Sequence, residues 1–127
     1  MPDCPLCEAL SGHDLVVATP GAVAIMDRYP LNPGHCLILP RRHTPLFWDL
    51  TAEETATVFD VLAQARKLIE EKYAPDGYNI GVNVGDAAGQ TIGHVHVHLI
   101  PRYRGDDDDP RGGVRWILPE RAVYWER

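Results

Sequence analysis

The sequence predicts one α+β domain built on a mostly antiparallel β-sheet, and three observations support this prediction. The chain has 127 residues, which is the length of one typical domain and enough for a real hydrophobic core. One long segment, which begins near residue 51, repeats apolar residues at helical spacing. Short strand-like segments cluster around this helix and do not alternate with helices, which favours an antiparallel sheet over a doubly wound parallel one.

Composition and charge argue against several classes of protein. Hydrophobic residues make up 45% of the chain and charged residues 24%, values typical of a globular domain and not of a disordered chain. The net charge of −6 argues against a bulk nucleic-acid binder, although a local site could still hold a compact anion. No stretch reaches the roughly 20 apolar residues of a membrane helix, and no signal peptide is visible. Three cysteines are too few for a disulfide scaffold, so a reducing cytoplasm is the expected location.

The long helix has a clear beginning and a clear end. Thr51 and Glu54 have the spacing of a capping box, in which each side chain satisfies the backbone N–H of the other residue. A Pro-Asp-Gly sequence at residues 75–77 ends the helix. A short helix is expected near Cys7–Leu10. The apolar face of the long helix consists of Val58, Leu62, Ala65 and Ile69.

The strands are short and are separated by turn residues. Pro and Gly residues at 30–34 form one loop, and the Gly-rich segment at 85–89 forms another. The expected strands are Val16–Ala18, Ala22–Met26, Cys36–Leu39, Tyr78–Val84 and Val95–Ile100.

The strongest functional signal is the sequence His-Val-His-Val-His-Leu at residues 94–99. Because the side chains of a strand alternate between faces, the three histidines would share one face and the apolar residues would face the core. His94 and His98 would be about 13 Å apart along a strand, too far for both to bind one zinc ion without leaning toward each other. We therefore expect the histidines to have different roles, with a metal site, catalysis and an incidental pattern left open at this point.

The residues before the histidines are typical of an anion-binding loop. Glycine-rich turns let backbone N–H groups approach an anion, and side-chain amides and hydroxyls add neutral donors. A phosphate group could therefore bind without a cationic stripe, although a plain hairpin turn also explains the glycines. The residues concerned are Asn83, Gly85, Gly89, Gln90 and Thr91.

Two segments resemble the histidine triad (HIT) family of nucleotide hydrolases and transferases. The segment Gly89–Ile100, with the sequence GQTIGHVHVHLI, resembles the family signature, and the segment Asp27–His43 resembles a second family block. With the amino-terminal Cys4-x-x-Cys7 pair, the resemblance covers residues 4–101. It implies a HIT-like α+β fold with a five-stranded, mainly antiparallel sheet, one long helix and one short helix. It also implies a homodimer.

The resemblance further implies a substrate class and roles for individual residues. The substrates would be purine nucleotides of the AMP type joined to a leaving group, as in phosphoramidates and dinucleoside polyphosphates. His96 would attack the α-phosphate and form a covalent nucleotidyl-histidine, and a neutral imidazole is a competent nucleophile near pH 7. Asp27 would accept the ribose hydroxyl groups. The other residues implied in catalysis or phosphate binding are His35, His98, Asn83, Gly89, Gln90 and Thr91.

The segment Cys4–Cys7 has the spacing of a zinc-ligand pair. A redox pair is the weaker alternative, because no thioredoxin-like strand precedes it. Resemblance to zinc-binding members of the family implies His43 and His94 as the other two ligands. Four nitrogen and sulfur ligands would make a closed, structural Zn²⁺ site, so the chemistry itself would need no cofactor. Cys36 is expected to be a small buried residue, and His13 is expected to have no functional role.

The resemblance weakens after Pro101. Within a single HIT domain of residues 1–127, we expect residues 102–127 to be an extension near the site or at a dimer interface. Trp116, Tyr124 and Trp125 could serve such an interface, and ordinary core packing is the alternative. The run Asp106–Asp109 is expected to be an exposed loop. Four arginines could bind further phosphates, with solvated surface positions as the alternative: Arg102, Arg104, Arg111 and Arg115.

Three classes of function remain to be compared. An enzyme is favoured, because a nucleotide-binding sensor would not need a nucleophile between two other histidines. A zinc-buffering protein has thin support in a single predicted site with two cysteines and two histidines. The sequence does not identify the physiological substrate, or whether water or phosphate resolves the intermediate.

Overall fold

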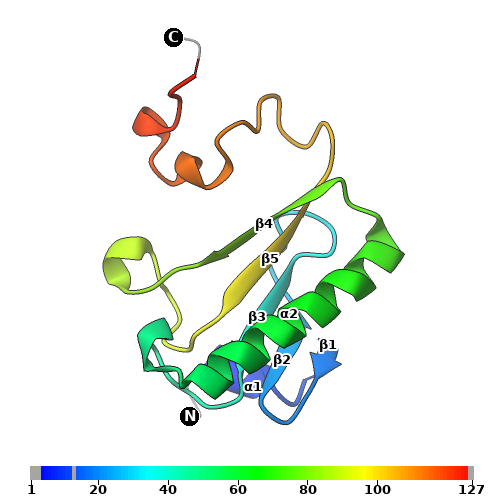
Figure 1. Cartoon of the computed structure of the whole chain (residues 1–127), viewed down its shortest axis with the longest axis vertical. Coiled ribbons are helices and arrows are strands. Elements are labelled where there is room, and N and C mark those ends of the chain that lie inside the picture. Colours follow the sequence, from blue (N-terminus) through cyan, green and yellow to red (C-terminus); the bar gives the residue numbers. More distant parts are fainter. Residues whose placement is uncertain (1–3, 13, 126–127) are drawn as a thin grey trace.

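Five antiparallel strands form one sheet in the order β1-β2-β3-β5-β4, with β5 inserted between β3 and β4 (Figure 1). The computed structural model describes residues 4–12 and 14–125, so His13 lies outside the described residues. The predicted α+β fold with a five-stranded antiparallel sheet is confirmed. The strands are β1 (Leu15–Ala18), β2 (Ala22–Met26), β3 (Cys36–Pro40), β4 (Gly77–Val82) and β5 (Val97–Arg102).

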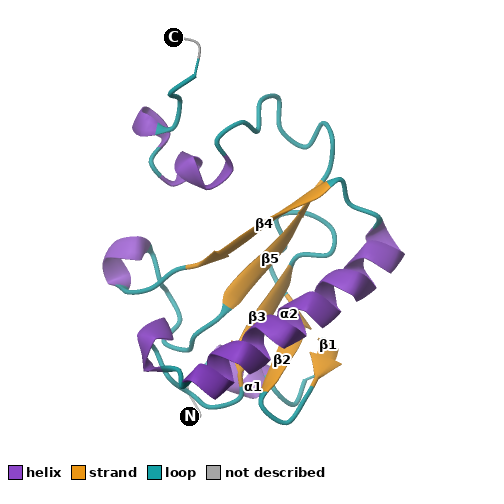
Figure 2. Cartoon of the chain, viewed as in Figure 1, coloured by secondary structure: helices purple, strands orange, loops and turns teal. Residues whose placement is uncertain are grey.

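Helix α2 (Ala52–Tyr73) lies along one face of the sheet (Figure 2). The predicted capping box is present: the Thr51 hydroxyl accepts the Glu54 N–H at 3.0 Å, and the Glu54 carboxylate accepts the Thr51 N–H at 2.9 Å. The helix ends at Tyr73 and is capped by Ala74, which has a left-handed φ of 48° and is followed by proline. The buried face of the helix consists of Val58, Val61, Leu62, Ala65 and Ile69.

The central strands β2 and β3 are buried on both faces, which explains why their sequences are continuously apolar. Alternate residues such as Ala24 and Ile38 join the core beneath α2. The residues between them, including Ile25 and Leu37, pack with the short helix α1 (Pro5–Ala9) on the opposite side. Among the described residues, no helix is both long and apolar enough to cross a membrane.

Strand β5 begins two residues later than expected. We predicted a strand over Val95–Ile100, with the three histidines pointing to one face, whereas the ladder starts at Val97 and contains only His98. The backbone N–H of Val95 is bonded at 2.8 Å to the carbonyl of Thr44, so this segment is held by a loop and not by a strand. His94 and His96 therefore lie in a bent segment just before the strand.

On β5, His98 faces the same side of the sheet as Leu37, its partner on β3. On that side, helix α1 covers β2 and β3, whereas residues of β4 and β5 line a hollow. This open face of β4 and β5 is the surface on which the candidate site lies.

The segment after β5, which we call the tail (residues 103–125), runs beyond β4 and ends in two short 3₁₀ turns, η3 (Gly113–Ile117) and η4 (Pro119–Arg121) (Figure 1). The Arg102 guanidinium anchors its beginning by contacting the Asp106 carboxylate at 2.9 Å. Further along, a Cβ at position 112 would lie 2.9 Å from the ring of Trp125, so glycine is needed there.

Candidate active site and adjoining metal-ligand cluster

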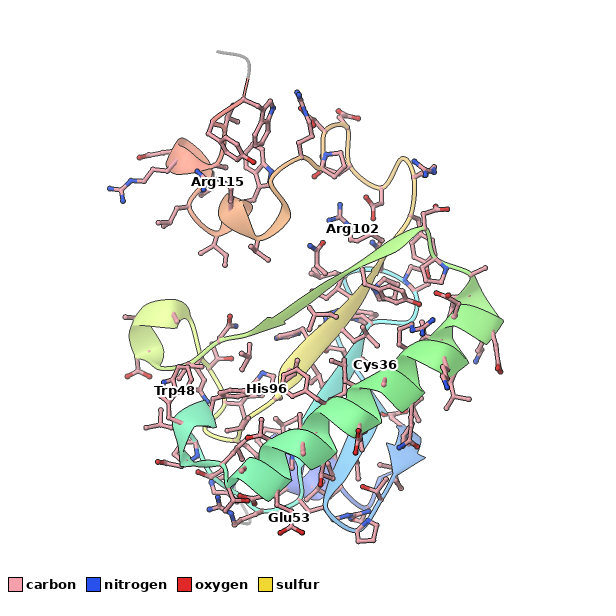
Figure 3. The ribbon with its side chains drawn as sticks, viewed as in Figure 1. Cys36, Trp48, Glu53, His96, Arg102 and Arg115 are labelled. Atoms are coloured by element: carbon pink, nitrogen blue, oxygen red, sulfur yellow. The ribbon has the colours of Figure 1, made fainter. Side chains whose placement is uncertain are left out.

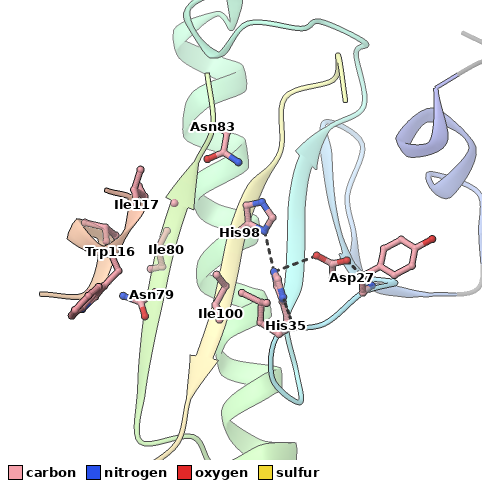
Figure 4. Close-up of a pocket in the computed structure, with 14 residues that line it drawn as sticks. Asp27, His35, Asn79, Ile80, Asn83, His98, Ile100, Trp116 and Ile117 are labelled. Carbon is pink, nitrogen blue, oxygen red and sulfur yellow. Dashed lines mark hydrogen bonds and ion pairs between the residues drawn. The ribbon is translucent and has the colours of Figure 1, made fainter. Parts of the chain in front are cut away.

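Three histidines from different segments form a row on the open side of the sheet, which we call the histidine row: His96, His98 and His35. The ring centroids of His96 and His98 are 5.3 Å apart, and those of His98 and His35 are 5.2 Å apart. His96 precedes β5, His98 lies within it, and His35 comes directly before β3 (Figures 3 and 4). The β3–β5 pairing therefore brings together residues that are 63 positions apart in the sequence.

A backbone hydrogen bond fixes the protonation of His96. Its Nδ1 lies 2.8 Å from the carbonyl oxygen of His94. Because a carbonyl can only accept, Nδ1 carries the proton and the lone pair of the neutral ring lies on Nε2. The residue is 8% exposed, and it lines neither the hollow over β4 and β5 nor the hollow beside α1.

A chain of hydrogen bonds fixes the protonation of His35 and His98. The Leu31 N–H donates to Nδ1 of His35 at 3.0 Å, so His35 carries its proton on Nε2. That Nε2–H faces Nδ1 of His98 at 3.0 Å and the Asp27 carboxylate at 3.3 Å (Figure 4). Since His98 accepts at Nδ1, its own proton lies on Nε2.

Both of these rings are held in the neutral form. Burial and, to a smaller extent, the neighbouring His96 and His35 together lower the pKa of His98 to about 4. Burial also lowers the pKa of His35, against an opposing effect of the Asp27 carboxylate. Near pH 7, His98 is therefore a neutral hydrogen-bond donor.

This shift predicts a dependence of stability on pH. The pKa of His98 is about 4 in the folded protein and 6.5 in its unperturbed state. The neutral ring thus contributes fully to stability above pH 6.5, and the contribution is lost as the pH falls toward 4. We expect wild type to lose up to about 2 kcal/mol more than His98→Gln between pH 7 and pH 4.5. Urea unfolding of both proteins at both pH values measures this difference, and equal losses would contradict the prediction.

Asp27 lies between two hollows. Its carboxylate accepts the Tyr29 N–H at 2.9 Å and faces His35 on its other side. One hollow, of about 500 Å³, lies between α1 and strands β2 and β3, where Ile25 and Leu37 contribute to its lining. The other, of about 570 Å³, lies over β4 and β5, and its lining includes His98 (Figure 4). Both volumes fall in the range of small-molecule sites.

The loop residues predicted to bind phosphate are only partly brought to this site. Asn83 lines the larger hollow together with His98. Gln90 and Thr91 line a separate hollow near Pro45. The amide of Gln90 braces the loop, because it accepts the Gly85 N–H at 2.9 Å and donates to the carbonyls of Pro45 and Ile92 at 2.7 and 3.1 Å. Gly89 adopts a left-handed φ of 85° at the end of the turn Asp86–Ala88.

In the described part of the chain, the larger hollow is not lined by any of the four arginines that were expected to bind further phosphates. Arg102 contacts Asp106 and the side-chain oxygen of Asn79. Arg111 pairs with Asp109 at 2.9 Å, and Arg115 donates to the backbone carbonyls of residues 121 and 122. The backbone N–H of Arg104 donates to Asp76. Three of the four guanidinium groups are thus engaged by the tail or by β4.

Beside the histidine row, two cysteines and two histidines meet as predicted from the sequence, and we call them the Cys–His cluster: Cys4, Cys7, His43 and His94. Their ligand atoms all lie within 4.8 Å of one another. The short helix α1 positions the pair of thiols, since Cys4 caps this helix and its sulfur accepts the Cys7 N–H at 3.3 Å.

The donor set fits a tetrahedral zinc ion. Bonds of about 2.3 Å to sulfur and 2.0 Å to nitrogen imply ligand separations of about 3.5 Å. Nδ1 of His94 lies 3.7 Å from Sγ of Cys4 and 3.5 Å from Sγ of Cys7, which in turn lies 3.3 Å from Nδ1 of His43. His94 donates Nε2–H to the Pro40 carbonyl at 2.8 Å, so its Nδ1 lone pair faces the thiols.

Comparisons with known proteins agree with this architecture. A family model described as "HIT domain" matches residues 11–105. Over 95 residues, the chain is 37% identical to the asymmetrical bis(5′-nucleosyl)-tetraphosphatase of Schizosaccharomyces pombe. This alignment covers 75% of this chain and 52% of the relative. Over 94 residues, it is 39% identical to the AP-4-A phosphorylase of Mycobacterium tuberculosis. This alignment covers 72% of this chain and 48% of the relative. The chain thus spans about half the length of these curated relatives.

A solved structure has the same fold over nearly the whole chain. The Zn-bound histidine triad family protein of Mycobacterium smegmatis superposes with a TM-score of 0.75 at 29% identity, and the match covers 91% of each chain. The family model alone covers more than half of the sequence and includes the histidine row. This chain belongs to the HIT family.

Proposed function

We propose that this protein is a nucleotidyl hydrolase that acts at the α-phosphate of nucleoside phosphoramidates or dinucleoside polyphosphates. The observation that carries the proposal is the protonation of two adjacent rings: His96 has its lone pair on Nε2, and His98 has a proton on Nε2. A neutral nucleophile beside a neutral donor suits attack on phosphorus, where negative charge shifts among the oxygens. Both curated relatives described above are named for tetraphosphate substrates that carry nucleosides.

The reaction would proceed in two displacements. The Nε2 lone pair of His96 forms a bond to the α-phosphorus while the bond to the leaving group breaks, and the leaving atom keeps the electron pair. A leaving nitrogen also takes a proton from solvent. Water then forms a bond to phosphorus and releases one proton, and the electrons of the N–P bond return to Nε2. The balance is one water consumed and one nucleoside monophosphate released with the leaving group.

Neighbouring groups would stabilise the charge on the phosphate. His98 would donate Nε2–H to a non-bridging oxygen, and His35 would hold His98 in that state from behind. Asn83 would bind a second oxygen. Gly89 and Thr91 would provide donors at the edge of the site, on a loop that the amide of Gln90 braces. Loss of one donor of this kind typically lowers the rate by about 10²–10³-fold.

The nucleoside would occupy the smaller hollow. The apolar side chains of Ile25 and Leu37 offer a surface for a purine base. Asp27 lies at the rim shared with the larger hollow, where its carboxylate could accept both ribose hydroxyl groups. This arrangement would place the α-phosphate next to the histidine row.

The Cys–His cluster would hold one structural zinc ion. All four of its positions would be taken by protein ligands, which leaves no open position for substrate. When bound, the ion would tie α1 to the segment that carries His94 and His96.

The family resemblance also implies a homodimer, and the sheet offers a surface for it. Strand β4 is an edge strand, since it pairs with β5 on one side only within the described residues. Unpaired backbone groups along such an edge can pair with a second copy of the chain. We propose this edge as the contact between protomers.

A panel of substrates tests the proposed function. We expect wild type to release AMP from adenosine 5′-phosphoramidate and from diadenosine tetraphosphate, and mass spectrometry of quenched reactions to detect a nucleotidyl group on His96. Added inorganic phosphate distinguishes the two outcomes for the intermediate, because transfer to phosphate yields ADP in place of AMP. Tight binding of AMP without turnover of any conjugate would instead identify a nucleotide sensor.

A further inference from the structure

The larger hollow extends well beyond the histidine row, and the proposed chemistry uses only one end of it. From His98 the hollow, which we call the groove, crosses the open face of β5 and β4 and ends at the tail (Figure 4). Four of its polar side chains lie at the end near the histidine row: Asp27, His35, Asn83 and His98. At its far end, Asn79 of β4 lies next to η3, and the tail contributes the apolar side chains of Val114, Trp116 and Ile117.

A glycine keeps the middle of the groove open. Gly81 is paired with His98 across β4 and β5, so a side chain at either position would lie on the same face. A Cβ at position 81 would have no heavy atom within 4 Å. Close packing therefore does not require glycine here, and its effect is to leave free space next to His98.

The tail presents a flat aromatic surface at the far end. The indole N–H of Trp116 donates to the Arg111 carbonyl at 2.8 Å, which satisfies the polar atom of the ring and fixes its orientation. The residue is still 39% exposed. An oriented, partly exposed indole with its N–H already bonded is suited to stacking on another planar ring.

We propose that the groove binds the leaving half of the substrate, and that this half carries a second aromatic base joined through a polyphosphate. This inference rests on the proposed function. A leaving group that departs from a phosphorus atom at His98 enters the groove directly, because His98 lines it. Its phosphates would lie at the polar end near Asn83, and its base would stack on Trp116. A dinucleoside polyphosphate would thus fill both hollows, whereas a phosphoramidate with a small leaving group would use one.

The test compares two substrates that share the transferred nucleotide and differ in the leaving group. In Trp116→Ala, the ratio of kcat/KM for diadenosine tetraphosphate to kcat/KM for adenosine 5′-phosphoramidate is expected to fall about tenfold, as is typical when an aromatic residue that stacks on a base is removed. Tyr124→Ala is the matched control, because Tyr124 is an aromatic residue of the same tail that is 70% exposed and does not line the groove. Its ratio should equal that of wild type.

A second pair of variants probes the groove from the strand side. Gly81→Val should narrow the groove and also lower the ratio, whereas Gly77→Val should not. Gly77 lies on the same strand, has equally open space around its Cβ and is not part of the groove lining. Unchanged ratios in both Trp116→Ala and Gly81→Val would overturn the inference while leaving the proposed hydrolase intact.

Binding without turnover separates this inference from the proposed function. With AMP present at saturation, calorimetry should detect ATP binding to wild type and about tenfold weaker binding to Trp116→Ala. This result is expected even if wild type cleaves neither conjugate, an outcome that would refute only the hydrolase. Equal ATP affinities would overturn the inference. The inference would also be overturned if Trp116→Ala changed the dimerisation constant but not the affinity for ATP, because a second copy of the chain would then occupy the groove.

Discussion

Replacing His96 by alanine is expected to lower kcat/KM toward diadenosine tetraphosphate by at least about 10⁴-fold, because the nucleophile and its bond to phosphorus are lost together. The fall should appear in kcat, since the hollows on either side of Asp27 keep their linings. Steady-state kinetics measures it, and the nucleotidyl adduct should disappear from the mass spectrum.

A matched pair of variants distinguishes a nucleophile from a packing residue. In His96→Gly, added imidazole can enter the vacated space and should restore part of the rate without labelling the chain. In His98→Asn, the nucleophile remains, so the adduct should still form but more slowly. An adduct that persists in His96→Ala would place the nucleophile elsewhere and refute the proposed mechanism.

Replacing Cys7 by alanine is expected to have the largest effect on stability. Three ligands hold zinc far less tightly than four, so the metal content should fall from about one ion per chain to near zero. An ion whose free concentration is about 1,000 times its Kd for the folded state adds about 4 kcal/mol to the free energy of unfolding. This contribution would be lost in Cys7→Ala. Elemental analysis gives the metal content, and urea unfolding gives the change in stability.

Cys36 provides the control for this experiment. It is fully buried in β3, and its thiol donates to the Gly34 carbonyl, so it lies outside the Cys–His cluster. Cys36→Ala should therefore keep its zinc and lose only the smaller stability typical of a modest core truncation. Wild type that is purified without chelators and contains no zinc would rule out the structural metal site.

The elements of the fold could largely be predicted from local pattern. Helix α2 was recognisable from its capping box and its apolar face, and β2 from its apolar run, because these signals are contained in the elements themselves. The start of β5 was predicted wrongly. Its first residues look like a continuing strand in sequence, but the Thr44 carbonyl, which belongs to a distant loop, takes the N–H of Val95.

The sequence predicted the side chains of the candidate site but not the backbone groups that orient them. His96, His98 and the Cys4–Cys7 spacing are visible in the sequence, whereas the groups that fix the protonation of the rings are backbone atoms, such as the Leu31 N–H and the Pro40 carbonyl. Any residue type supplies such atoms, so no sequence signal marks them. The groove was missed for a related reason: the apolar tail residues have no regular spacing, and only the folded chain brings them opposite β5.

The ring and the backbone carbonyl of His94 take part in two different sites. Its ring lies among the cysteines, while its carbonyl orients His96. Every amino acid carries that carbonyl, so the nucleophile depends on the path of the main chain at this point more than on the side chain there. The ring, held by Cys4 from 90 residues earlier in the sequence, restrains that path. If the restraint were released, the imidazole of His96 could turn over and offer the wrong nitrogen. The amino-terminal Cys4 would thus help to decide which nitrogen of His96 meets phosphorus.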